Sequence, residues 1–207
     1  MKKDIGMKKG MYIQRNCELS QEFHFCHPMS KYKINQIYNS SFTGSPLWDL
    51  FSDSSKSLEK TFNISVRKMF DLPKETHCYL LEPITETKHL KFVLLKRLIN
   101  FKKQVMNCDK NLLKTMFQIC EHDSRSITGS NLRKLMLLCD KSSISDIYSS
   151  NIDNLSYREI PQEEAWRIET IKELIEIKTD PDNLLPNFPK EEIEEILSLL
   201  CVSLYFN

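Results

Sequence analysis

The sequence predicts an all-α protein, a multi-helix bundle of about seven to nine helices that ends in an αα-hairpin. Apolar residues recur at spacings of three and four along most of the chain, and it contains no alternating runs of β-branched residues. Only four of the 207 residues are Gly, and 41% are hydrophobic, which suffices for one good core or two small ones. We therefore expect little or no sheet.

The leading segment predicts two helices. Residues 1–25 form a basic helix in which Tyr12, Leu19 and Phe23 mark a weakly defined apolar face. Residues 30–42 form the next helix, because their apolar side chains recur near helical spacing.

The stretch SSFTGSPLWDLF, residues 40–51, predicts a corner between helices. Gly44 falls where a helix would end in a left-handed residue, and Pro46 falls where a new helix would start. Ser45 is then the expected N-cap of a short helix that turns three side chains inward: Leu47, Trp48 and Phe51. The triplet Thr-Gly-Ser recurs at 128–130, where Ser is again the expected cap and Gly the expected helix stop.

Helical periodicity continues to residue 139. The predicted helices are a short helix with turns within LPKETHCYLLEPITETKHL and longer helices at 57–70, 88–106, 110–121 and 130–139. In the helix at 88–106 the residues expected to face the core are Leu90, Leu94, Leu98, Phe101 and Val105. The residues left toward water or phosphate are Lys91, Lys96, Lys102 and Lys103. The helix at 110–121 rests on the apolar pattern of Leu112, Leu113, Met116, Phe117 and Cys120.

A connector divides the chain. Residues 140–160 are rich in Ser, Asp and Asn, which predicts a mostly loose segment with one helical turn. The predicted domains are therefore 1–139, a connector at 140–160, and a helical hairpin at 161–207. Pro189 should open the last helix of that hairpin, with Glu191 and Glu192 in its first turn, where they suit the helix dipole.

Charge is distributed unevenly although the net charge is only +1. Residues 1–110 hold 19 Lys+Arg against 11 Asp+Glu, net +8, whereas residues 111–207 hold 10 against 17, net −7. This asymmetry favours contact between the basic half and a polyanion, although solvated helix faces alone would also produce it.

The sequence lacks the motifs of several functional classes. Seven Cys, an odd number at irregular spacing, predict free thiols in a reducing compartment, and the absence of a run of about 18 apolar residues predicts a soluble chain. No phosphate-binding loop of the P-loop or dinucleotide type occurs. One group of residues suggests a zinc site or a Cys-His nucleophile, but its spacing fits neither: Cys17, His24, Cys26, His27, His77 and Cys78.

Two motifs carry a resemblance to a known family. Taken together, the segments KKGMYIQRNCELSQEFHFCHP, KINQIYNSSFTGSPLWDLFS and NISVRKMFDLPKETHCYLLEPIT resemble the region downstream of the palm in reverse transcriptases of jockey-like (LINE) non-LTR retrotransposons. The residues that match Y-x-x-x-F-x-G-S-x-L-W are Tyr38, Phe42, Gly44, Ser45, Leu47 and Trp48. Those that match W-N-x-x-V-R-x-x-x-x-L-P-x-x-T-H-x-x-L-L are Asn63, Val66, Arg67, Leu72, Pro73, Thr76, His77, Leu80 and Leu81, with Phe62 in the place of the family's Trp. The segments ITGSNLRKLML and NFPKEEIEEILSLLCVS resemble the family's C-terminal end, so that the resemblance covers nearly the whole chain.

The resemblance implies a non-catalytic part of a polymerase. Residues 1–139 would correspond to the helical thumb, which contacts the sugar-phosphate backbone of an RNA or RNA/DNA template-primer, and the upstream polymerase domains would be a further partner. The expected nucleic-acid contacts are Lys8, Lys9, Arg15, Lys31, Lys33, Arg67 and Lys68. The family's palm holds Mg²⁺ on aspartates that include an adjacent pair, and this sequence has no Asp-Asp, so we expect no catalytic residue, no metal and no cofactor in this chain.

Two alternatives stay open. The acidic C-terminal hairpin would serve equally as a docking surface in a protein-interaction module, and the chain would also fit an inactive remnant of a mobile element. An intracellular location is expected, without a choice between nucleus and cytoplasm.

Overall fold

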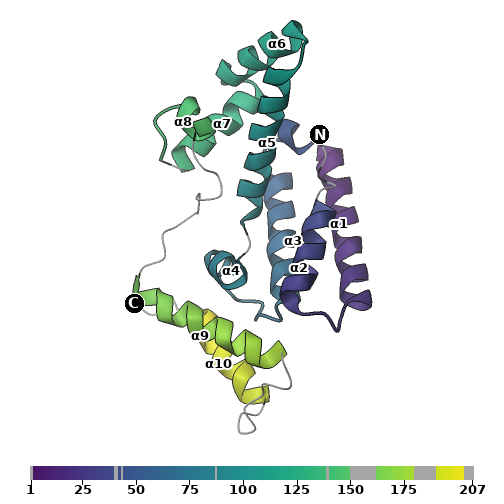
Figure 1. Cartoon of the computed structure of the whole chain (residues 1–207), viewed down its shortest axis with the longest axis vertical. Coiled ribbons are helices and arrows are strands. Elements are labelled where there is room, and N and C mark those ends of the chain that lie inside the picture. Colours follow the sequence, from purple (N-terminus) through teal and green to yellow (C-terminus); the bar gives the residue numbers. More distant parts are fainter. Residues whose placement is uncertain are drawn as a thin grey trace. The chain divides into compact units, whose positions relative to one another are not determined.

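The structure, a computed structural model, describes residues 2–39, 42, 44–86, 88–138, 140–149, 162–179 and 190–202. Within these residues the secondary structure is entirely helical, which confirms the predicted all-α class (Figure 1). The first elements are α1 (Lys2–Glu22), α2 (Pro28–Asn39), the 3₁₀-helix η1 (Ser45–Leu47), α3 (Asp53–Met69) and α4 (Cys78–Thr85). The others are α5 (Leu90–Asn107), α6 (Asn111–His122), α7 (Ile127–Leu138), α8 (Ile144–Ser149), α9 (Gln162–Thr179) and α10 (Lys190–Val202).

The contacts divide the chain into two compact units. The first unit comprises Met1–Lys8, Phe42–Glu59 and Lys88–Tyr157, and the second comprises Lys9–Ser41, Lys60–Thr87 and Arg158–Asn207. Helices α1 and α3 each contribute to both units. The predicted succession of 1–139, 140–160 and 161–207 follows chain order instead, and it stays a prediction about domain organisation.

Trp48 anchors the first unit. Its buried ring lies 6.0 Å from that of Phe42, and its indole Nε1 donates a hydrogen bond to Asp4 Oδ2 at 2.7 Å. The amide of Asn131 on α7 donates to the Trp48 carbonyl at 2.7 Å and accepts from the Leu50 backbone N–H at 3.1 Å. The segment after η1 is therefore fixed at both its side chain and its backbone.

The corner at residues 44–51 differs from its prediction in three details. Gly44 is left-handed as expected (φ 86°), but it is itself the N-cap of η1 and lies beyond the end of α2 at Asn39. Among the described residues Ser45 makes no capping bond, and its buried hydroxyl has no hydrogen-bond partner there. Leu47 is 59% exposed and does not point inward, because the single 3₁₀ turn places Trp48 toward the core instead.

Helices α5 to α8 form a continuous packed series within the first unit. Contacts join α5 to η1 and α6, α6 to α7, and α7 to α8, and Figure 1 shows α6 turning back beside α7. Leu94, Leu98 and Val105 of α5 are buried as predicted. The predicted connector at 140–160 contains one short helix, α8, and its residues 150–160 lie outside the described residues.

The start of α7 corrects the prediction for the second Thr-Gly-Ser triplet. Residues 128–130 lie inside α7, and Ser126 makes the capping bond, accepting from the Gly129 N–H at 2.9 Å. Gly129 does not stop a helix; a Cβ at this position would lie only 2.2 Å from the carbonyl oxygen of Asp123. Glycine is required because two backbones approach closely here.

The exposed face of α6 is a further difference from expectation. Leu112, Met116 and Ile119 are 74%, 54% and 62% exposed, whereas Phe117 and Glu121 are buried. The apolar spacing predicted the helix correctly. However, most of its apolar side chains are exposed, and α6 packs on its neighbours through the side that carries Phe117 and Glu121.

The core of the second unit joins α1 to α3. Tyr12 and Leu19 of α1 and Phe62 and Val66 of α3 are buried, in agreement with the predicted apolar faces. The Tyr12 and Phe62 rings stack with centroids 6.1 Å apart.

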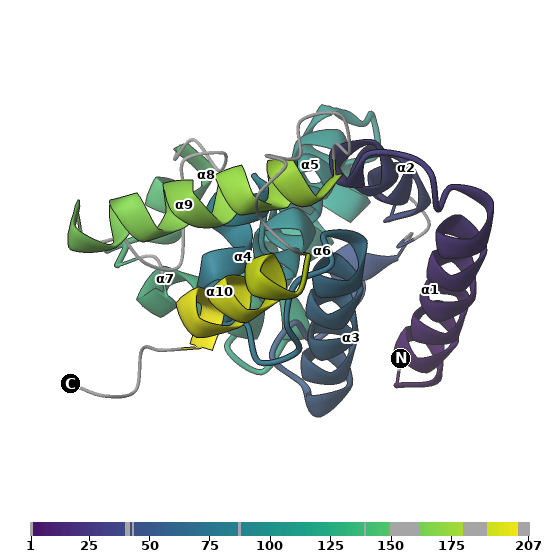
Figure 2. The same ribbon diagram turned by 90° about the horizontal axis from the view of Figure 1, so that it is seen from below.

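The C-terminal helices pack on the rest of the second unit. Helix α9 contacts both α4 and α10, and Figure 2 shows α9 and α10 side by side, as the predicted hairpin requires. Lys178 of α9 bridges Asp71 at 2.5 Å and Glu194 at 3.3 Å, which links the loop after α3 to both helices. Residues 180–189, which include Pro189, lie outside the described residues.

Candidate nucleic-acid interface

The structure separates the residues predicted to contact nucleic acid. Lys8 belongs to the first unit, and the other six belong to the second: Lys9, Arg15, Lys31, Lys33, Arg67 and Lys68. Helix geometry divides them further. Lys31 and Lys33 are two residues apart on α2 and thus project to nearly opposite sides, whereas Lys8 and Arg15, seven residues apart on α1, share one side.

Arg67 stabilises a loop. Its Nε and Nη2 donate to the Thr76 carbonyl at 2.9 and 2.5 Å, and Nη2 also lies 3.3 Å from the Cys78 thiol. The Thr76 hydroxyl in turn donates to the Pro73 carbonyl at 2.8 Å. The Arg and the Thr of the matched motif therefore hold the turn between α3 and α4, which is a structural reason for both residues.

Lys31 also binds a backbone carbonyl, because its ammonium group donates a hydrogen bond to the His24 carbonyl at 2.9 Å. Lys33 and Lys68 are exposed. A nucleic-acid role for any of the seven residues stays a prediction, and Lys33 and Lys68 are the two whose exposure suits it best.

The units carry opposite charge. The first unit holds 16 Lys+Arg against 10 Asp+Glu, net +6, and the second holds 13 against 18, net −5. Six of the seven predicted contacts thus lie in the acidic unit. Positive charge is concentrated elsewhere, in the first unit, where residues 88–149 alone hold 12 Lys+Arg against 5 Asp+Glu.

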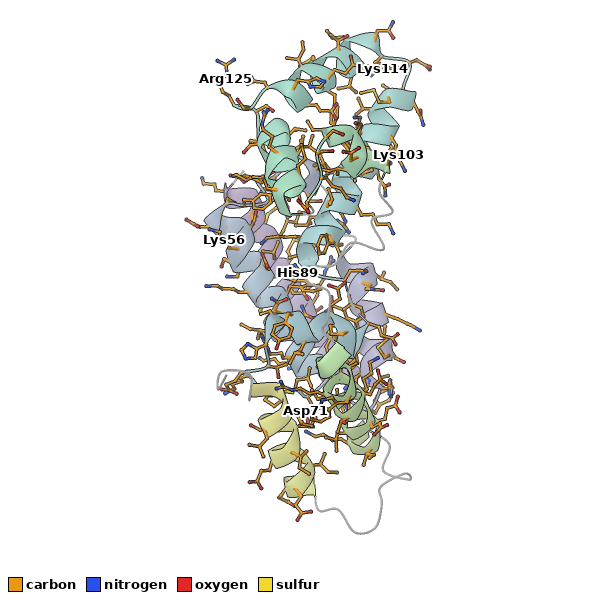
Figure 3. The ribbon with its side chains drawn as sticks, turned by 90° about the vertical axis from the view of Figure 1, so that its left-hand side faces the viewer. Lys56, Asp71, His89, Lys103, Lys114 and Arg125 are labelled. Atoms are coloured by element: carbon orange, nitrogen blue, oxygen red, sulfur yellow. The ribbon has the colours of Figure 1, made fainter. Side chains whose placement is uncertain are left out.

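Helix α5 is the most basic element of the first unit. Its 18 residues include five cations and no acidic residue. Four of its exposed residues repeat at intervals of four, three and four and therefore lie along one side of the helix: Lys96, Asn100, Lys103 and Asn107. We call this set the α5 stripe. Figure 3 shows Lys103 at the outer edge of the molecule, and the exposed Lys110 follows just beyond the helix.

Two other lysines of α5 are not left toward water, contrary to expectation. Lys91 lies 3.2 Å from Glu59, and Lys102 lies 2.6 Å from the buried Glu121. His89, which caps α5 by accepting from the Lys91 N–H, places its Nε2 at 3.0 Å from Glu59. Burial acts to raise the pKa of Glu59, but the hydrogen bond and charge of His89, together with Lys91, outweigh it and hold the pKa below its ordinary value.

The sequence contained a signal for the α5 stripe. The predicted helix at 88–106 already contained these lysines, but the predicted contacts lie elsewhere, in the two leading helices and in the matched motif. The complete absence of Asp and Glu between Lys88 and Cys108 would have identified this helix directly.

No protein-family model, curated protein or solved structure matches this chain. Among the described residues, no three His, Cys, Asp or Glu side chains gather closely enough to hold a metal ion. Within the same residues, no helix combines the length and the apolarity needed to cross a bilayer.

Proposed function

We propose that this chain binds the sugar-phosphate backbone of a template-primer duplex without reading its sequence, as the thumb and C-terminal part of a jockey-like non-LTR reverse transcriptase. The α5 stripe is the observation that supports this proposal most. Lys96 and Lys103 offer cations to phosphates, and Asn100 and Asn107 offer amide N–H donors between and beyond them.

The arrangement suits backbone contact for physical reasons. An acid-free helix face does not repel a polyanion, and each lysine that neutralises a phosphate releases a condensed counterion. Because these side chains extend from one regular helix whose opposite side is buried, their spacing is fixed before binding. The hydrogen-bonded pair Arg67 and Thr76, both from the motif that carries the resemblance, would then stabilise the loop between α3 and α4 rather than contact the duplex.

In this proposal the chain does no chemistry. Polymerisation would require Mg²⁺ held by aspartates of a palm, and the sequence contains no adjacent Asp pair. Its contribution would be to hold the duplex.

The test is binding of a fluorescent RNA–DNA hybrid duplex, followed by anisotropy between about 50 and 200 mM salt. The double variant Lys96→Gln/Lys103→Gln should weaken binding of unrelated sequences equally and reduce the slope of log K against log salt by about 2. Lys33→Gln/Lys68→Gln is the matched control, because it removes the same charge from exposed sites in the second unit. Its slope should stay unchanged.

Three results would count against the proposal. A wild-type affinity that barely changes with salt would exclude backbone contact. An unchanged slope in Lys96→Gln/Lys103→Gln would exclude the α5 stripe as the binding surface. A reduced slope in the control alone would show that the residues predicted from the sequence form the interface instead.

A protein-interaction role is the second candidate, and one observation favours it. Trp166 on α9 is 63% exposed, and Glu169 and Glu173 lie on the same side of that helix. Exposed Trp residues are enriched at protein interfaces, and this one is flanked by acids that suit a basic partner. Binding of a basic protein that survives nuclease treatment and requires Trp166, without any duplex binding, would favour this candidate.

A further inference from the structure

Helix α6 turns its apolar side outward. Its buried residues include Glu121, which pairs with Lys102 at 2.6 Å, whereas an amphipathic helix of a globular protein normally buries its apolar side. Four apolar residues of α6 are between 41% and 74% exposed, and we call them the α6 face: Leu112, Leu113, Met116 and Ile119. The first, third and fourth follow one another at intervals of four and three, so they lie along one side of the helix. A contiguous apolar side that stays exposed indicates an interface.

The α6 face carries no charge. The structure describes the whole of α6, and none of its exposed residues is Lys, Arg, Asp or Glu. Lys114, which is half-buried, projects from the side opposite to Met116, because two residues of a helix are about 200° apart. A strongly acidic or basic partner would therefore find no opposite charge on this face. The face also lacks the cluster of about four to eight cations that attracts anionic lipids.

The charges at the two ends of α6 balance. Asp109 and Lys110, both exposed, precede its first residue, and Asp123 and Arg125, which pair at 3.2 Å, follow its last. Figure 3 labels Lys114, near the start of α6, and Arg125, beyond its end. If two copies of α6 pair antiparallel, an end with one acid and one base meets another such end, and the helix dipoles oppose each other. A parallel pair would place like charges side by side and align the dipoles, so the antiparallel pair is favoured.

We propose that the α6 face is the contact between two copies of this chain, which pair their α6 helices antiparallel about a two-fold axis. The midpoint between Leu112 and Ile119 lies next to Met116 in the sequence. Leu112 of each copy therefore packs on Ile119 of the other, and the two Met116 side chains meet close to the axis. The contact uses none of the α5 stripe, so it is independent of duplex binding.

The dimer should be weak. Four partly exposed side chains supply less than the roughly 800 Å² that each partner buries in a standard interface, so we expect a dissociation constant on the order of 10 to 100 μM. Sedimentation equilibrium of the full chain between about 1 μM and 1 mM should show monomers and dimers in equilibrium. Monomers alone over this whole range would overturn the proposal.

A charge at the axis should break the contact. Met116→Lys brings two ammonium groups together and should raise the dissociation constant at least about tenfold. Met7→Lys is the matched control, because Met7 lies in the same unit and is 58% exposed against 54% for Met116. It should leave the dissociation constant unchanged, and both variants should keep the helix content of the parent by circular dichroism. Equal dimerisation of the two variants would refute a contact through the α6 face.

Salt separates this contact from association driven by charge. The two units carry net charges of +6 and −5, so a head-to-tail contact between the units of different copies would weaken as salt is raised from about 50 to 500 mM. The apolar contact should persist over the same range. A dimer that dissociates as salt is raised would be evidence against the α6 face and for the charged contact.

Disulfide trapping tests the antiparallel orientation, in a Cys120→Ser background that removes an exposed thiol one turn away. Under mild oxidation Met116→Cys should form a covalent dimer, whereas Leu112→Cys should link to a copy that carries Ile119→Cys and not to itself. Self-linking of Leu112→Cys in place of Met116→Cys would contradict the antiparallel pair. Binding of monomers to vesicles of equal parts phosphatidylcholine and phosphatidylserine, lost in Met116→Lys, would show that a membrane covers the face instead.

Discussion

Replacing Gly129 with Ala should destabilise the first unit strongly. A Cβ at this position would lie 2.2 Å from the Asp123 carbonyl oxygen and 2.8 Å from that of Cys120. Ordinary contacts of this kind are no shorter than 3.4 Å, so α7 would have to move about 1 Å away from the end of α6. Both obstructing atoms are backbone, and neither can rotate away.

The displacement would also break hydrogen bonds. Ser126 donates through its hydroxyl to the carbonyls of Cys120 and Asp123, and accepts from the Gly129 N–H at 2.9 Å. Overpacking and weakened capping together should lower the free energy of unfolding by about 3–5 kcal/mol, against a gain of about 1 kcal/mol from the better helix propensity of Ala. We expect a net loss of about 2–4 kcal/mol.

The two tryptophans permit a unit-specific assay. Trp48 lies in the first unit and the exposed Trp166 in the second, so a Trp166→Phe background leaves Trp48 as the fluorescent reporter of the first unit. Urea unfolding in this background measures the effect of Gly129→Ala on that unit. Gly6→Ala is the matched control, because Gly6 lies in the helical, exposed part of the same unit with nothing within 4 Å of its added Cβ.

The control should change stability in the opposite direction. Gly6→Ala should raise the free energy of unfolding by about 0.5–1 kcal/mol, because Ala restricts the unfolded chain and favours helix. If Gly129→Ala unfolds at the same urea concentration as the parent, the close approach of α6 and α7 described above is wrong.

Two further predictions concern charged side chains. Arg67→Ala should lower the free energy of unfolding by about 1–3 kcal/mol, because it removes the hydrogen bonds to the Thr76 carbonyl. Lys68→Ala is the control and should be nearly neutral, because Lys68 is exposed. Equal effects of the two variants in urea unfolding would show that Arg67 does not stabilise the loop. The pKa of Glu59 is lower in the folded protein than its ordinary value of 4.5, so the stability it adds is present above pH 4.5 and is lost as the pH falls through the folded pKa. Glu59→Gln should therefore be less stable than the parent at pH 7 and lose less stability on acidification, as measured by urea midpoints; parallel pH profiles would contradict the ion pair with His89.

Helix positions followed from the sequence because periodicity is a local property. The predicted helix at 88–106 corresponds to α5 at Leu90–Asn107, and that at 57–70 to α3 at Asp53–Met69. Spacing placed Tyr12 and Phe62 each on an apolar face, and both are buried, but it did not predict that the two rings stack on each other. Caps were less predictable: Ser126, rather than Ser130, caps α7, since several nearby serines offer equivalent chemistry and the tertiary contact of Gly129 selects the register.

The sequence also could not show which cations are available. In the sequence, Arg67 cannot be told apart from its neighbour Lys68, nor Lys102 from Lys103, because all four are basic residues on predicted helices. In the structure, however, Arg67 binds a backbone carbonyl and Lys102 binds a buried carboxylate. Their partners are 9 and 19 residues away along the chain, and no local pattern encodes such contacts.

By itself the sequence determined that this protein is helical, where its helices lie, and that it carries separated basic and acidic charge, because helix periodicity and residue charge are read directly from the order of the amino acids. Only the tertiary structure decided which apolar faces are covered, as on α6, which charges are paired, and that the basic unit contains α5 rather than the loop around Arg67. The reason is that burial and ion pairing depend on distances between segments remote in the chain, which neither composition nor spacing specifies.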